Sequence, residues 1–171
     1  LALDQVDRRY GRSLPPEPQP VLERALPMPI AGDRSDFTEM LIEDYSLHPW
    51  ANLPVRLELE VEDASGRTGL SQPREMLLPG RRFFDPLAAA LIEQRQALLW
   101  NREGAPDIAM ILRALYNDPQ DLFRSDLQAE RVRRIFTRLE RLAPYGLTDA
   151  QQDALAAALW QLALTLEEGD P

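Results

Sequence analysis

The residues that could take part in catalysis are few and lie far apart in the chain. His48 is the only histidine, and no nucleophile or orienting carboxylate stands at a recognisable spacing from it, so we expect it to pack in a loop. Residues 69–73 lack the second glycine of a nucleophile elbow and fall in a strand-like region. The absence of cysteine excludes thiol nucleophiles and zinc–thiolate sites. The sequence therefore predicts no catalytic residue, no cofactor-binding residue and no enzymatic activity.

Acidic side chains near the expected strand ends could in principle bind a metal ion. Glu43, Asp44, Glu62 and Asp63 carry the oxygen ligands that Ca²⁺ prefers. No compact loop alternates such ligands, however, so a solvated acidic rim is the favoured interpretation. No metal ligand and no cofactor is predicted.

Basic side chains cluster in one predicted helix, where they could hold a phosphate or an acidic partner. Glu130 and Glu140 stand at helical spacing from them, which favours ion pairing within the helix. The net charge of −9 argues against non-specific binding to nucleic acid or anionic lipid. The arginines concerned are Arg131, Arg133, Arg134, Arg138 and Arg141.

The first half of the chain is patterned for strands. Prolines 15, 16, 18 and 20 predict an extended lead over residues 1–20. Residues 22–30 are predicted to form at most an edge strand, and residues 37–45 are a further strand candidate. In residues 53–63, apolar and charged side chains alternate, so the face with Val55, Leu57, Leu59 and Val61 is expected to be buried and the other exposed. A turn follows at residues 63–66, and residues 68–78 return as the partner. This pattern predicts a small antiparallel immunoglobulin-like β-domain with too few strands for a complete immunoglobulin fold.

The second half is patterned for helices. Asp85 and Pro86 predict an N-cap and the first helical position of a helix that ends near residue 100. Pro106 opens a second helix, Ser125 or Asp126 a third, and a capping box at residues 148–151 the last. The longest apolar run, residues 154–166, is too short to span a bilayer. We therefore predict an α+β protein, with a Pro-rich lead and β-domain in residues 1–80 and a four-helix antiparallel bundle in residues 81–171.

Four stretches carry a resemblance to a known family. They are His-Pro-Trp-Ala-Asn-Leu-Pro-Val at residues 48–55, the turn region 63–73, and the runs 76–88 and 91–95. Over about residues 26–168 the chain resembles a family of long, uncharacterised alphaproteobacterial membrane proteins. These proteins have transmembrane helices near the N-terminus, and a tail rich in Gln and Gly. The resemblance implies a domain of unknown function on the periplasmic side of the inner membrane, anchored by helices outside this segment, and it carries over no catalytic residues.

These observations lead to one functional hypothesis and two alternatives. We expect a segment of a longer polypeptide that acts as a non-enzymatic scaffold or protein-interaction module of the cell envelope. Its expected partner is a protein, with no nucleic acid, and with membrane contact only through regions outside the segment. The first alternative is a regulatory or recognition domain of an envelope enzyme whose catalytic part lies elsewhere. The second is a Ca²⁺-dependent adhesion module.

Overall fold

The chain folds into two compact units, which we call the sheet unit and the helical unit. The computed structural model describes residues 1–6, 10–26, 36–118 and 122–169. The sheet unit comprises Leu1–Arg8 and Pro18–Arg81, and the helical unit comprises Arg9–Glu17 and Arg82–Pro171. The expected α+β class, with a small antiparallel sheet region followed by four helices, is confirmed.

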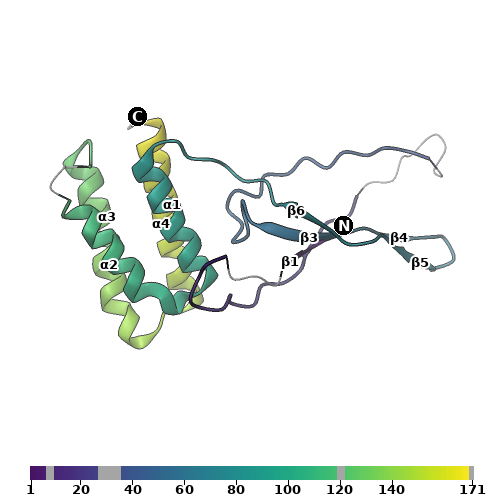
Figure 1. Ribbon diagram of the computed structural model, residues 1–171, viewed down its shortest axis with the longest axis horizontal. Helices are drawn as coiled ribbons and strands as arrows, with labels where there is room; N and C mark the ends of the chain where they lie inside the picture. Colours follow the sequence, from purple (N-terminus) through teal and green to yellow (C-terminus); the bar gives the residue numbers. More distant parts are fainter. Residues whose placement is uncertain (7–9, 27–35, 119–121, 170–171) are drawn as a thin grey trace. The chain divides into compact units, whose positions relative to one another are not determined.

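The sheet unit contains a four-stranded antiparallel sheet and a two-stranded hairpin (Figure 1). The order in the larger sheet is β2-β1-β3-β6, and the hairpin is made of β4 and β5. The strands are β1 (Ala2–Gln5), β2 (Leu22–Glu23), β3 (Pro54–Glu58), β4 (Glu60–Glu62), β5 (Thr68–Leu70) and β6 (Arg74–Leu77). Of the predicted edge strand at residues 22–30, only β2 is formed among the described residues, and residues 27–30 lie outside them.

One face of the larger sheet is buried because apolar side chains stand opposite one another across the ladder. Leu3 pairs with Leu22 on one side and with Leu57 on the other, so all three share a face. This face packs with Trp50, Val55 and other side chains into a small core. Its members are Leu3, Trp50, Val55 and Leu78, with Leu22, Tyr45 and Leu57 partly buried against them.

The prediction of a strand over residues 37–45 was wrong. No strand forms there, and Met40 and Ile42 are exposed. The segment instead ends in a side-chain turn, in which Asp44 Oδ1 accepts hydrogen bonds from the Ser46 backbone N–H at 2.9 Å and from the Ser46 hydroxyl. An aspartate that bonds the backbone two residues ahead favours a turn over a ladder, which explains the difference.

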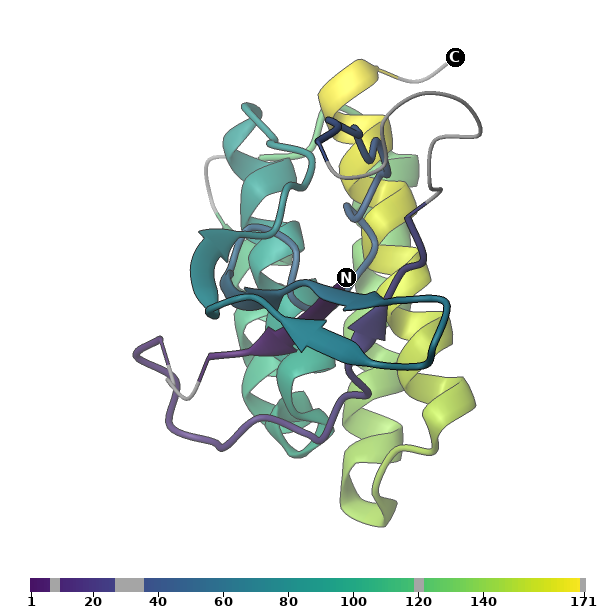
Figure 2. The same cartoon turned by 90° about the vertical axis from the view of Figure 1, so that its right-hand side faces the viewer.

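The helical unit is an antiparallel bundle in which α1 packs mainly against α4, and α2 against α3 (Figures 1 and 2). Its helices are α1 (Pro86–Trp100), α2 (Ala105–Tyr116), α3 (Asp126–Leu142) and α4 (Asp149–Glu168), with short 3₁₀ turns at Arg102–Gly104 and Ala143–Tyr145. No helix in the described part of the chain is long and apolar enough to cross a membrane.

The helix starts follow the predicted capping residues. Asp85 Oδ1 accepts from the backbone N–H groups of Leu87 at 2.9 Å and Ala88 at 3.0 Å. Thr148 and Gln151 form a reciprocal capping box at the start of α4. These bonds satisfy N–H groups that have no partner within the helix.

Leucines dominate the core of the helical unit. Leu91, Leu98, Leu112, Leu139 and Leu159 have no exposed surface. Leu91 lies inside this core, among apolar side chains of all four helices. Phe83 packs edge to face on Trp160, with ring centroids 5.4 Å apart, whereas Phe84 is exposed.

The segment formed by residues 10–17 belongs to the helical unit, which differs from the expected division at residues 80 and 81. Trp100 Nε1 donates to the Leu14 carbonyl at 2.9 Å, and Asn101 Nδ2 donates to the Pro15 carbonyl at 3.0 Å. Glu17 accepts from Arg102 Nε at 2.5 Å and from Gln152 Nε2 at 2.6 Å. These side chains replace the ladder partners that a proline-rich strand lacks, so the lead is anchored on the helices.

Candidate functional site

Hairpin β4–β5 in the sheet unit is the candidate site, because its strands are buried on neither face. Every residue of both strands is exposed, and Val61 and Leu70 each retain 65% of their accessible surface. The alternating pattern had predicted that Leu59 and Val61 would continue the buried face of Val55 and Leu57. That prediction was wrong, because the small core ends at Leu57.

The register of the hairpin mixes apolar and acidic side chains. Glu60 pairs with Leu70 and Glu62 pairs with Thr68, so these residues share a face. Val61 pairs with Gly69 on the opposite face. Because Gly69 has no side chain, nothing covers Val61 from the neighbouring strand. The hairpin therefore presents an acidic face with one leucine, and an open face with one valine.

A dense set of hydrogen bonds orders the tip of the hairpin, as the predicted turn at residues 63–66 requires. Asp63 Oδ1 accepts from the Ser65 backbone at 2.9 Å, from the Ser65 hydroxyl at 2.6 Å and from the Arg67 backbone at 3.0 Å. Gly66 has a φ of 79°, which glycine adopts without strain. The hydroxyl of Ser65, followed by the Arg67 backbone, lowers the pKa of Asp63 to about 2. The carboxylate is therefore a structural part of the turn.

The base of the hairpin is closed by a second set of bonds. The Ser71 backbone donates to the Leu59 carbonyl at 2.9 Å, and the Leu59 backbone donates to the Ser71 hydroxyl at 2.9 Å. The arm is thus defined by its backbone and its turn, without a core of its own. An isolated two-stranded hairpin is only marginally stable in water, so contact with a further surface would stabilise it.

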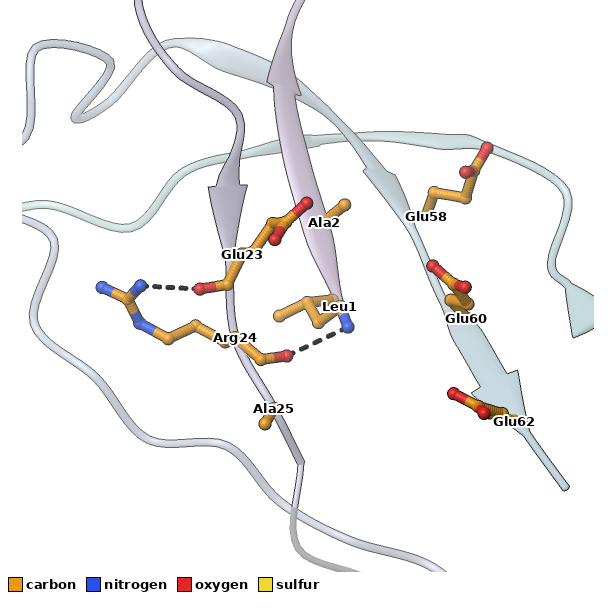
Figure 3. Close-up of a pocket in the computed structure, with 8 residues that line it drawn as sticks. All are labelled: Leu1, Ala2, Glu23, Arg24, Ala25, Glu58, Glu60 and Glu62. Carbon is orange, nitrogen blue, oxygen red and sulfur yellow. Dashed lines mark hydrogen bonds between the residues drawn. The ribbon is translucent and has the colours of Figure 1, made fainter. Parts of the chain in front are cut away.

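An acidic strip borders the hairpin and lines a hollow of about 310 Å³ (Figure 3). Glu58, Glu60 and Glu62 follow one another along β3 and β4, and Glu23 comes from β2. Among the described residues, none of the carboxylates of Glu58, Glu60 and Glu62 takes part in a hydrogen bond or ion pair. Mutual repulsion of these carboxylates would be relieved by a basic partner.

The arginine in this hollow is already engaged. Arg24 Nε contacts Glu43 Oε2 at 2.7 Å, and Arg24 Nη1 donates to the Glu23 carbonyl at 2.7 Å. The hydrogen bond with Arg24 lowers the pKa of Glu43, and that with Glu43 raises the pKa of Arg24. Arg24 therefore forms no ion pair with the three glutamates along β3 and β4.

His48 occupies a packing position in a turn of the sheet unit. The Trp50 backbone N–H donates to His48 Nδ1 at 3.1 Å, and the two rings meet edge to face at 4.9 Å. Burial lowers the pKa of His48, with a smaller contribution from Arg24. A neutral imidazole that accepts a backbone bond is held as a structural group, although the absence of catalytic residues stays a prediction.

The four acidic residues considered for Ca²⁺ are not brought together. Glu43 forms an ion pair with Arg24, Asp44 accepts a hydrogen bond from the Ser46 backbone, and Asp63 accepts one from the Ser65 backbone in the hairpin turn. Within the described ranges, no group of three His, Cys, Asp or Glu side chains is arranged to hold a metal ion.

The arginines of α3 follow the expected pairing only in part. Glu130 accepts from Arg133 at 2.7 Å and from Arg134 at 3.3 Å, within the helix as predicted. Glu140, however, binds Arg113 of α2, with Nε to Oε1 at 2.8 Å. The pairing of Glu140 within α3 was a wrong prediction, because its side chain faces the neighbouring helix.

Comparison with protein families matches residues 1–171 to a domain of unknown function, DUF4175. No curated protein and no solved structure matches the chain.

Proposed function

We propose that this chain, which belongs to the DUF4175 family of domains of unknown function, is a non-enzymatic protein-interaction segment that binds its partner through hairpin β4–β5. The observation that carries the proposal is an ordered hairpin with both faces exposed. Val61 and Leu70 are apolar side chains that water solvates poorly, and each is 65% exposed. A partner that covers them removes apolar surface from water and stabilises the arm.

The chemistry of the hairpin defines the kind of partner. In the described part of the chain, β4 and β5 pair only with each other, so each has an open edge of backbone N–H and C=O groups. Open edges accept an additional strand from a partner, whose alternate side chains then contact one face. Glu58, Glu60 and Glu62 form no ion pair among the described residues, and they favour lysine or arginine on that strand. The proposed partner is therefore an extended protein segment with alternating basic and apolar residues.

We further propose that this interaction takes place on the periplasmic side of the inner membrane. The support is the resemblance to the family of uncharacterised alphaproteobacterial membrane proteins, which is carried by residues 48–55, 63–73, 76–88 and 91–95. These 171 residues contain no cysteine, so a single Tyr145→Cys substitution at an exposed position gives a clean test once any cysteine elsewhere in the proposed longer polypeptide is replaced. A membrane-impermeant maleimide should label Tyr145→Cys in that polypeptide before the inner membrane is broken. Labelling that occurs only after lysis would place the segment on the cytoplasmic side.

The hairpin proposal is tested by capture from detergent-solubilised cell envelopes of the source organism. The bait is the 171-residue chain, compared with a Val61→Glu, Leu70→Glu double variant and with Met110→Glu. Met110 is a matched control because it is an exposed apolar residue, at 64%, in the helical unit. We expect capture to fall roughly tenfold or more in the hairpin variant, since central apolar contacts carry much of the binding energy. Equal capture by all three baits would show that the partner binds elsewhere.

A further inference from the structure

A pocket of about 250 Å³ lies within the helical unit, where residues 11–14 run beside the end of α1 and the start of α2. Its lining includes Arg12, Gln94, Ala97, Trp100, Asp107 and Ile108. The volume is below the roughly 300–1,000 Å³ typical of pockets for drug-sized molecules, so the pocket suits a small ligand. The pocket belongs to the helical unit, whereas hairpin β4–β5 belongs to the sheet unit.

Arg12 supplies a cation that forms no direct ion pair within the described residues, and Glu93 is the acidic residue that interacts with its charge from a distance. Its guanidinium lies 5.7 Å from the centroid of the Trp100 ring, and Nη2 contacts Gln96 Oε1 at 3.4 Å. Its Nε is buried and has no hydrogen-bond partner among the described residues. Within those residues, no carboxylate oxygen lies within 4.0 Å of the Arg12 guanidinium. A guanidinium that is partly desolvated and unpaired favours binding of an anion.

Gln94 adds a second polar group that lacks a partner. The residue lines the pocket on α1 and is only 7% exposed. Its side-chain amide has no hydrogen bond to any described residue. The amide atoms of Gln94 are not fully enclosed by protein, so a ligand in the pocket can form hydrogen bonds with them.

The remaining walls restrict the ligand. Ala97, Trp100, Ile108 and part of Ile111 form an apolar surface. Asp107 is exposed at the rim and carries a negative charge. A carboxylate beside the entrance repels a doubly charged phosphate more strongly than a singly charged carboxylate. The pocket therefore favours a small monoanion with an apolar body.

We propose that this pocket binds the carboxylate of a small apolar ligand, with Arg12 as the ion partner and the Gln94 amide as a hydrogen-bond donor. The ligand's apolar body lies on Ala97, Ile108 and the Trp100 ring. Two sources share this chemistry: a free apolar acid or amino acid, and the C-terminal residue of a peptide. The proposal is independent of the role given to hairpin β4–β5.

The test follows the Trp100 indole N–H in two-dimensional NMR spectra of the 171-residue chain, because the indole lies in the pocket wall. The probes are 4-methylpentanoate, leucine, N-acetyl-leucine and leucinamide, with inorganic phosphate as a further anion. We expect saturable shifts with at least one of the three carboxylates, and none with leucinamide or phosphate. Stronger binding of N-acetyl-leucine than of leucine would identify a peptide C-terminus as the ligand, and the reverse a free amino acid.

Variants assign the residues. Arg12→Gln should weaken the binding of the best carboxylate roughly tenfold or more, since hydrogen bonds to charged groups are strong. Gln94→Leu should weaken it less. Arg138→Gln is the matched control, because Arg138 is exposed on α3 and away from the pocket, and it should bind as the parent does.

The dispersion of the amide spectrum shows whether each variant is folded. Arg12→Lys keeps the positive charge and should therefore retain part of the affinity for the carboxylate. Two results would overturn the proposal. One is the absence of a saturable shift with all three carboxylates at concentrations on the order of 10 mM. The other is that the folded Arg12→Gln variant binds the best carboxylate as tightly as the parent chain does.

Discussion

The two units bury apolar surface very differently. In the helical unit, one continuous core joins all four helices, and leucines such as Leu91, Leu139 and Leu159 have no exposed surface. In the sheet unit, the buried cluster consists of Leu3, Trp50, Val55 and Leu78 among the described residues. Burial of apolar surface is the dominant favourable contribution to folding. We therefore expect the helical unit to be the more stable of the two, and the sheet unit is the one that has exposed strands.

The largest effect is expected from a substitution at the centre of the small core. Trp50 is 2% exposed, and Trp50→Ala should cost about 3–5 kcal/mol through the lost transfer free energy and the cavity. Because few other buried side chains support the sheet unit, we expect that unit to unfold while α1–α4 stay folded. Hydrogen exchange measured by mass spectrometry would show loss of protection in β1, β3 and β6 only. Loss of protection in the helices as well would show that the two units unfold together.

A comparable truncation in the large core should be tolerated. Leu91 has no exposed surface, and Leu91→Ala should lower the free energy of unfolding by about 2–5 kcal/mol. The helical unit should nevertheless remain folded at 25 °C, because its other core leucines stay packed. Thermal melting followed by far-UV circular dichroism measures the loss, with Met110→Ala as the exposed control, expected within about 0.5 kcal/mol of the parent. A shift equal to that control would contradict the assigned burial.

The cap of α1 gives a smaller effect in the same unit. Asp85→Ala removes the acceptor of the Leu87 and Ala88 N–H groups and should cost about 1 kcal/mol. The ion pair of Asp85 with Arg124 contributes little, because Arg124 is largely exposed. Asp153→Ala, at an exposed position within α4, is the control. Indistinguishable melting temperatures for the two variants would mean that the cap does not stabilise α1.

The stability of the sheet unit should depend more strongly on pH than the stability of the helical unit. The pKa of His48 is lowered from 6.5 by burial, so the unfolded chain takes up this proton more readily than the folded one. The stability that neutral His48 contributes is therefore complete above about pH 6.5 and declines as the pH falls below that value. We expect the protection of sheet-unit amides to fall between pH 7 and pH 5, with a smaller change in the helices.

The control for this experiment is His48→Asn, which keeps an acceptor for the Trp50 N–H but cannot titrate. Its sheet-unit protection should not change over the same range. An unaltered pH dependence in this variant would assign the effect to another group.

Features that depend on neighbours in the sequence were predictable. The cap at Asp85, the capping box at Thr148 and the turn at Asp63 each bond backbone groups within four residues. Such bonds form between groups that the chain already holds close together, so residue types alone indicate them. The end of residues 37–45 has the same origin, because Asp44 bonds the backbone two residues ahead and so favours a turn there.

The exposed site was not predictable in the same way. Alternation at Leu59 and Val61 predicts which side chains share a face, but it contains no information on whether that face is covered. The small core of the sheet unit includes Trp50 and extends along the strand no further than Leu57. The position of Trp50 depends on a turn outside the strand. The pocket around Arg12 likewise requires residues 10–14 to reach α1, which lies some 80 residues further along the chain.

The sequence by itself determined the α+β class, the helix starts and the hairpin turn, because each results from hydrogen bonds and apolar spacing over a few residues. Only the tertiary structure decided that residues 10–17 pack with the helices, that Val61 remains uncovered and that Gln94 and Arg12 line one pocket. Contacts such as that of Glu17 with Gln152 join residues far apart in the chain. Their formation depends on the packing of whole elements, and no local pattern records which elements will meet.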